Sequence, residues 1–214
     1  MDFGIKGKRA LVCAASRGLG FASAKALAEE GVDLVISARD GEKLKAAAAE
    51  LRKVSHAKIE YIACDLASAE DRKNLIESTQ EKLGGVDILI HNVGGPKAQS
   101  CEKTSTADWQ EAFDKLFQPI VELNEKFLPG MKERKWGRII TVTSLSVIEP
   151  IANLALSNGI RSAVTAMLKT LADEVATSGV TVNCIAPGLI RTARTEDLME
   201  ARRKVTGQSA EDYL

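Results

Sequence analysis

The fold of this chain is decided by Arg9-Ala-Leu-Val-Cys-Ala14, which runs on through Ala15-Ser-Arg-Gly-Leu-Gly20 into an alanine-rich stretch ending at Glu30. The apolar run predicts a strand, the glycine-rich segment a tight turn, and residues 21–30 a helix. Gly18 and Gly20 have no Cβ, so the backbone can turn sharply there and let a pyrophosphate approach the positive end of the helix. A glycine-rich turn is a weak signal by itself, and an ordinary strand-to-helix connection is the alternative.

Strand-like and helix-like segments alternate along the rest of the chain. Apolar runs follow at Asp33 to Ala38, Ile59 to Cys64, Val86 to His91, Arg138 to Thr143 and Val180 to Ile185, with segments of helical composition between them. Together with the first run they predict a six-stranded parallel sheet with helices on both faces, a Rossmann-type doubly wound α/β fold. Such folds bind ligands beyond the carboxyl ends of their strands. The apolar stripe near residues 160–176 indicates a core helix or a subunit contact.

Composition limits the function classes. The 214 residues are 45% hydrophobic and 27% charged, so a single domain over residues 1–214 with one substantial core is expected. The 29 basic and 29 acidic residues balance, and no overall field favours nucleic acid or an anionic membrane. No apolar leader or membrane-spanning run is visible, which predicts a cytoplasmic protein. Cys13, Cys64, Cys101 and Cys184 are widely separated, which predicts buried free thiols and no metal site.

Three motifs in order give the chain a family resemblance. They are Cys13-Ala14-x-x-x-Gly18-x-Gly20, His91-Asn92-Val93-Gly94 and Pro187-Gly188-Leu189-Ile190-Arg191-Thr192. From about Lys6 to Thr192 the chain resembles the short-chain dehydrogenase/reductases, nearest to the 3-oxoacyl-carrier-protein reductase-like branch. The resemblance, with the charge pattern described below, implies these contacts to a nicotinamide dinucleotide: Ala14, Ser16, Arg17, Gly18, Leu19, Gly20, Arg39, Asp65, Leu66, Asn92, Gly94, Arg161, Pro187, Gly188, Ile190 and Thr192.

Some of these positions carry a specific expectation. Ala14 and His91 depart from the family motifs: Ala14 forms the turn if its φ is negative, and His91 is interpreted as a packing residue. Asp65 resembles the family residue that hydrogen-bonds the adenine amino group, with helix capping or turn formation as its other role. Asn92 resembles a residue that braces the ends of the central strands, and Gly94 allows close approach of adenosine.

Charge near the end of the second strand predicts the form of the cofactor. That strand ends Ser37-Ala38-Arg39-Asp40, and Ala38 stands where NAD-preferring relatives carry an aspartate. A carboxylate there hydrogen-bonds the adenosine ribose, whereas arginine accommodates a 2′-phosphate. Arg17 and Arg39 therefore favour NADP(H) over NAD(H), because guanidinium groups bind phosphate with charged, often bidentate donors. The alternatives are that both arginines are solvated and that Asp40 pairs with Arg39.

The catalytic motif is where the resemblance weakens. The family uses Ser to orient the carbonyl oxygen, Tyr as proton donor, Lys to lower the Tyr pKa and hold the ribose, and Asn to support a proton relay. Ser144 occupies the serine position, and the usual spacing then reaches Ser157 and Arg161 in place of Tyr and Lys. The Asn position falls near Leu116 or Phe117, which cannot relay protons. The resemblance therefore implies an altered tetrad with Ser144, Ser157 and Arg161 as its catalytic residues.

These replacements affect chemistry more than binding. A phenol with a pKa near ~10 can be tuned toward neutrality, whereas a serine hydroxyl ordinarily cannot. Arg161 stays protonated, so it can hold the ribose but does not shuttle a proton. His91, Ser146, Glu149 or a bound water are the candidates to supply the proton, and capping or packing is the alternative role for Ser157.

The sequence therefore predicts an NADP(H)-binding oxidoreductase that acts on a small carbonyl or alcohol by a modified proton path. A non-catalytic nucleotide-binding or scaffold protein is the alternative, and the altered tetrad is its evidence. Residues 193–214 are expected to form a mobile segment that covers the substrate. The resemblance would add a seventh strand, which this sequence does not contain, and an exposed edge in its place predicts a homo-oligomer. No nucleic-acid or membrane partner is expected.

Overall fold

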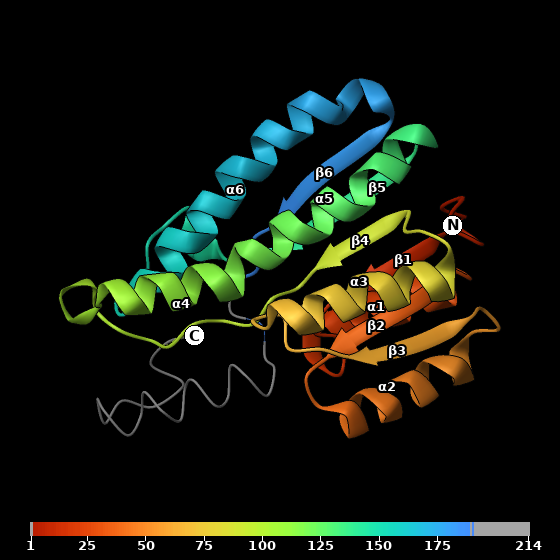
Figure 1. The fold of residues 1–214 in the computed structure, drawn as a ribbon, viewed down its shortest axis with the longest axis horizontal. Coiled ribbons are helices and arrows are strands. Elements are labelled where there is room, and N and C mark those ends of the chain that lie inside the picture. The colour runs from red at the N-terminus through yellow and green to blue at the C-terminus, as the bar shows by residue number, and fades with distance from the viewer. Residues whose placement is uncertain (1, 189, 191–214) are drawn as a thin grey trace.

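The computed structural model describes residues 2–188 and 190, and within them six strands form one sheet. The strand order is β3-β2-β1-β4-β5-β6, and every neighbouring pair is parallel (Figure 1). The strands are β1 Arg9–Val12, β2 Asp33–Ala38, β3 Ile59–Ala63, β4 Ile88–His91, β5 Gly137–Val142 and β6 Val180–Ile185. The helices are α1 Gly18–Glu29, α2 Gly41–Val54, α3 Ala69–Leu83, α4 Thr106–Leu116, α5 Gln118–Glu133 and α6 Ala155–Val175, with short 3-10 turns η1 Cys101–Lys103, η2 Leu145–Val147 and η3 Ala176–Ser178.

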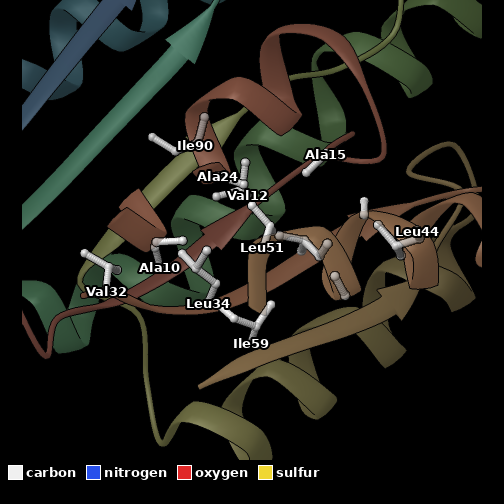
Figure 2. Close-up of a cluster of buried hydrophobic side chains, with 14 of the residues drawn as sticks. Ala10, Val12, Ala15, Ala24, Val32, Leu34, Leu44, Leu51, Ile59 and Ile90 are labelled. Atoms are coloured by element: carbon white, nitrogen blue, oxygen red, sulfur yellow. The ribbon is translucent and has the colours of Figure 1, made fainter. Parts of the chain in front are cut away.

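The sheet is covered by helices on both faces. Successive side chains of a strand point to opposite faces, so Ala10 and Val12 of β1 join a buried cluster with Leu51 of α2 (Figure 2). Leu11, between them, belongs to the opposite cluster with Leu75 of α3. The first cluster is covered by α1 and α2, and the second by α3, α5 and the end of α6. The predicted Rossmann-type doubly wound sheet is confirmed.

A third apolar cluster fixes α6 against α4. Leu156, Ile160 and Val164 of α6 are buried together with Ala112 and Leu116 of α4. The stripe predicted near residues 160–176 is therefore a core contact, and the helix that carries it begins earlier, at Ala155. This early start places the predicted catalytic positions 157 and 161 within the first two turns of α6.

The chain order reverses beside β1, which lies between β2 and β4. Ligands of doubly wound folds bind at such a switch point, beyond the carboxyl ends of the strands. Most of the predicted site residues lie in the loops, or at the helix starts, that directly follow β1, β2, β3, β4, β5 and β6, and these segments therefore meet at this one edge. Ser157 and Arg161 lie further along, in the first two turns of α6. Thr192 and the predicted substrate-covering segment 193–214 lie outside the described residues. No helix of the described part is both long and apolar enough to cross a membrane.

Candidate nucleotide and catalytic site

The glycine-rich turn folds closely against the end of β4. Ala14 has a φ of 48°, so the turn forms without the negative φ that was given as its condition, and a residue with a Cβ adopts the left-handed region at a cost of about 1–2 kcal/mol. Position 20 requires glycine, because a Cβ there would lie 2.3 Å from the Ala14 carbonyl oxygen and 2.8 Å from Asn92 Nδ2. Asn92 Nδ2 donates to that same carbonyl at 3.4 Å. Asn92 thus joins the ends of β1 and β4.

The first turn of α1 follows directly. The helix begins at Gly18, three residues before the predicted start, so Gly18, Leu19 and Gly20 form its first turn. The amides of a first helical turn have no partner inside the helix and carry the positive end of its dipole. With Ser16 half-buried just before them, these amides form a backbone cradle suited to a pyrophosphate.

Two exposed arginines stand near this cradle. Arg17 is the N-cap residue of α1, and Arg39 follows the last residue of β2. Asp40 caps α2 by accepting a hydrogen bond from the Lys43 amide at 3.1 Å, and it pairs with Lys43 Nζ at 2.7 Å. The alternative pairing of Asp40 with Arg39 is therefore wrong. Within residues 2–188 and 190, no ion pair engages Arg17 or Arg39.

The loop after β3 is held by its own hydrogen bonds. Asp65 Oδ1 accepts from the Ala67 amide at 3.1 Å, and the cap of α3 is Ser68. Of the two structural roles considered for Asp65, turn formation is the one observed. The Leu66 carbonyl accepts from Arg72 Nη1 at 2.8 Å, which fixes the loop while the Asp65 side chain remains exposed.

Arg161 is hydrogen-bonded to the backbone at the end of β5, immediately before Ser144. Ser144 Oγ accepts from the Ser146 amide at 3.2 Å and caps η2. Arg161 is 9% exposed, and its Nη1 donates to the carbonyls of Val142 at 3.1 Å and Thr143 at 3.3 Å, while Nη2 donates to Gly94 O at 3.0 Å. A buried guanidinium is costly unless its donors are satisfied. These three hydrogen bonds offset part of that cost and hold a permanent positive charge between the ends of β4 and β5.

Ser157 is buried in the first turn of α6, one helical turn before Arg161. The N-cap residue is Leu154, which makes no side-chain cap, so Ser157 does not cap the helix. Between the two lies Gly159, where a Cβ would meet the Trp109 ring of α4 at 2.7 Å. Sequence reasoning did not identify this contact. Its only signal was a glycine inside a helix, which implies a close approach.

The apolar residues at the relay position and the buried His91 are not suited to proton transfer. Leu116 is buried, and Phe117 lies at the break between α4 and α5. His91 is fully buried, its Nε2 lies 2.9 Å from Asn124 Oδ1, and burial lowers the pKa of His91 to about 4. His91 is thus neutral and sealed from solvent near pH 7, which agrees with its predicted packing role. Glu149 is exposed on the loop after η2.

The third motif approaches Ser144 from β6. The Pro187 carbonyl accepts from the Leu145 amide at 3.0 Å, so the segment after β6 is fixed beside the residue that follows Ser144. A Cβ added to Gly188 or Gly94 would meet no atom of residues 2–188 and 190 within 4 Å. Within this part of the structure both glycines leave room around their Cα atoms. Ile190 is 45% exposed beyond them.

The cysteine prediction is partly wrong. Cys13 and Cys64 are buried, and burial raises the pKa of each thiol to about 12. Cys101 is exposed on η1 and Cys184 is half-buried on β6, because η1 lies outside the sheet core and β6 is the outer strand of the described sheet. All four are free, and no group of metal-binding side chains is found among the described residues.

Comparison with known proteins agrees with this geometry. Residues 8–203 match the family model described as short chain dehydrogenase. The bovine (Bos taurus) dehydrogenase/reductase SDR family member 4 is 36% identical over 194 residues, which is 90% of this chain and 69% of the relative.

Solved structures resemble the chain more completely. L-sorbose reductase from Gluconobacter frateurii, complexed with NADPH and L-sorbose, has a TM-score of 0.89 at 32% identity and covers 100% of this chain and 80% of its own. An NADPH-bound short chain oxidoreductase from Pseudomonas aeruginosa PAO1, described as containing an atypical catalytic center, has a TM-score of 0.83 at 29% identity. The match covers 91% of this chain and 76% of that protein. An NAD+-bound xylitol dehydrogenase has a TM-score of 0.86 at 25% identity, and the match covers 95% of this chain and 79% of that protein.

Proposed function

Because the chain belongs to the short-chain dehydrogenase family of oxidoreductases, we propose that it binds NADP(H) and interconverts a small carbonyl compound and its alcohol by a modified proton path. The observation that carries this proposal is the placement of Arg161. Its guanidinium is buried and hydrogen-bonded to the carbonyls of Gly94, Val142 and Thr143, the last of which immediately precedes Ser144. A site whose tyrosine and lysine are both replaced thus still holds a fixed charge next to its serine.

The residues present fit a nicotinamide dinucleotide. Because position 20 has no Cβ, the turn at Ala14 can lie against the start of α1, and the backbone amides of the first turn of α1 can face a pyrophosphate. Gly94 and Gly188 leave space where a Cβ would otherwise stand. The exposed guanidinium groups of Arg17 and Arg39 suit the 2′-phosphate of NADP(H). The sorbose reductase, which binds NADPH, favours NADP(H) as the cofactor of this chain. The xylitol dehydrogenase binds NAD+, so the relative affinity of this chain for NADPH and NADH is to be measured.

The chemistry follows from what each side chain can do. The nicotinamide, when bound, supplies or accepts the hydride. Ser144 Oγ orients and polarises the carbonyl oxygen, and Arg161 stabilises the negative charge that develops on it. Arg161 does not release its proton near pH 7. The side chain of Ser157 is much shorter than a tyrosine side chain, so its hydroxyl lies further from a substrate in the tyrosine's place. We therefore assign the proton to a water held over Ser157.

The rival function is a non-catalytic nucleotide-binding or scaffold protein, and the apolar side chains of Leu116 and Phe117 in the relay position favour it. Oxidation of NADPH by the wild type across a broad carbonyl panel, repeated with Ser144→Ala, decides between the two. Turnover that Ser144→Ala abolishes supports the oxidoreductase. Tight NADPH binding with no turnover on any carbonyl supports the rival.

Location and assembly are part of the proposal. The free buried thiols of Cys13 and Cys64 suit a reducing compartment such as the cytoplasm. We also propose a homo-oligomer, because β6 is an outer strand of the described sheet and its last residue, Ile185, is 52% exposed. Sedimentation is expected to show association, and a monomer at high protein concentration would contradict it. The proposal includes no nucleic-acid or membrane partner.

A further inference from the structure

Residues 94–99 form a strap that ties the end of β4 to the start of α6. At one end of the strap, the Gly94 carbonyl accepts from Arg161 Nη2 at 3.0 Å. At the other end, the Gln99 carbonyl accepts from the Ala155 amide at 3.2 Å, and Gln99 forms a parallel bridge with Leu154. Because α6 has no side-chain cap of its own, its first amide depends on the strap.

Asp108, at the start of α4, contacts two residues of this strap. Its Oδ1 pairs with Lys97 Nζ at 2.5 Å, and its Oδ2 accepts from Gln99 Nε2 at 3.3 Å. Oδ2 also accepts from the amide of Ser105 at 2.9 Å and from its hydroxyl at 2.8 Å, which completes a capping box. The Lys97 ammonium, followed by Ser105, holds the pKa of this carboxyl well below its usual range. The carboxylate is thus charged at every working pH.

Beside these contacts the strap borders a cavity. Its volume is about 150 Å³, and the described residues that line it are Gly95, Pro96, Lys97, Asp108, Glu111, Ala112, Lys115 and Leu156. A segment packed against solid protein is held by contacts on all sides, whereas one that borders a cavity lacks them on that side. The strap therefore depends on its polar contacts, and Asp108 makes two of them.

The neighbouring residue, Trp109, contacts the same turn of α6 from another side. Its ring lies against the backbone of Gly159, where a Cβ would be 2.7 Å away. Gly159 stands between Ser157 and Arg161 on α6. Consecutive residues of α4 thus act on one turn of α6, Trp109 by direct contact and Asp108 through the strap.

We propose that Asp108 is a positioning residue, whose carboxylate holds strap 94–99 so that the α6 turn bearing Ser157 and Arg161 stays in register with Ser144. In its catalytic consequence this inference rests on the proposed function. The competing role for Asp108 is confined to capping α4 with Ser105. The two roles differ in what they predict for α6, which is about fifty residues away in the sequence.

Three variants separate these roles. Asp108→Asn removes the charge that holds Lys97 and weakens one of the two acceptors of Gln99 Nε2, the other being the Lys103 carbonyl. Ser105→Ala breaks the capping box but leaves the Asp108 carboxylate and its partners Lys97 and Gln99 in place. Glu111→Gln alters a carboxylate that lines the same cavity but pairs with Lys115. Exchange of the Ala155 amide, measured by NMR on the full chain, is expected to be at least about tenfold faster in Asp108→Asn and unchanged in the other two. Equal exchange in Asp108→Asn and Ser105→Ala would overturn the inference.

A second readout tests the catalytic consequence. In an active wild type, Asp108→Asn is expected to lower kcat about tenfold or more with little change in KM, since small misplacement of reacting groups costs rate. Ser105→Ala keeps kcat near the wild-type value. Equal kcat in these two variants would overturn the inference even if exchange differed. A wild type without turnover would instead refute the proposed function, and the Ala155 exchange result would still decide the role of Asp108.

Discussion

The proposed nucleotide region of this chain, residues 9–94, and its proposed catalytic region, residues 116–161, offer different parts of the molecule for recognition. In the first, the decisive groups are backbone amides and a missing Cβ at Gly20. In the second, they are the side chains of Ser144, Ser157 and Arg161. Recognition by backbone tolerates many side-chain replacements, whereas proton transfer requires a particular functional group. The family's binding geometry is therefore kept where its tyrosine and lysine are lost.

The largest expected effect tests the catalytic region. Loss of a positioned acid typically lowers a rate about 10²- to 10⁴-fold, so the wild type should reduce carbonyls slowly while binding NADPH measurably. The double change Ser157→Tyr with Arg161→Lys is expected to raise kcat at least about tenfold in stopped-flow NADPH oxidation. Adding Ser144→Ala should remove the gain. Fast, Ser144-dependent turnover by the wild type would show that the region has not lost its chemistry.

The next effect concerns His91, on the strand that joins the two regions. Burial lowers its pKa to about 4 from an ordinary 6.5. Between these values the unfolded chain binds a proton that the folded chain does not. The free energy of unfolding should therefore fall as the pH drops from 6.5 toward 4, by about 3 kcal/mol in total.

Urea unfolding at pH 7, 6 and 5 measures this loss. His91→Asn should flatten the dependence, whereas the same change at the exposed His56 should leave it in place. A His91→Asn variant as acid-sensitive as the wild type would assign the loss to other groups.

A smaller effect tests whether the nucleotide region is set by backbone geometry. Gly20→Ala should lower the free energy of unfolding by about 2 kcal/mol, because its Cβ would overlap the Ala14 carbonyl. It should also weaken NADPH binding. Gly94→Ala, which meets no atom within 4 Å, should leave stability unchanged. Equal melting temperatures for the two variants would show that the turn can relax, and the contrast between the regions would weaken.

The smallest effect concerns the cofactor's phosphate. Arg39→Ala should weaken NADPH binding by about 1.5 kcal/mol and leave NADH binding unchanged, because only NADPH carries the charged group it would bind. Lys45→Ala removes the same charge from a nearby exposed position on α2 and is the control. Titration calorimetry with both nucleotides measures the difference. Equal affinity of the wild type for NADPH and NADH would refute the assigned preference.

The sheet could be predicted from the sequence because buried parallel strands are continuous apolar runs, and all six such runs became strands. The ends of elements were less certain. β1 stops at Val12 because Cys13 and Ala14 enter the turn, whose contact with Asn92 and Gly20 sets a positive φ at Ala14. Contacts between segments distant in sequence decide that geometry, and no local pattern records them.

The candidate site divides in the same way. Its glycine turn and the position of Ser144 could be predicted from motif spacing. The strap could not, because Gln99, Asp108 and Ala155 come from three separate segments that meet only in the folded chain. The assignment to the 3-oxoacyl-carrier-protein reductase-like branch stays a prediction, as do the roles of the individual cofactor-binding residues.

The segment after β4 is hydrogen-bonded to both regions. Asn92 holds the Ala14 carbonyl of the nucleotide turn, and two residues later the Gly94 carbonyl holds Arg161. A nucleotide that shifts this segment therefore alters the free energy of Arg161's placement, and linkage requires the reverse effect to be equal. A substrate that binds more tightly when the nucleotide is present must tighten nucleotide binding by the same factor. Cooperative binding would then arise within a single chain from two hydrogen bonds made by Asn92 and Gly94 in the segment after β4.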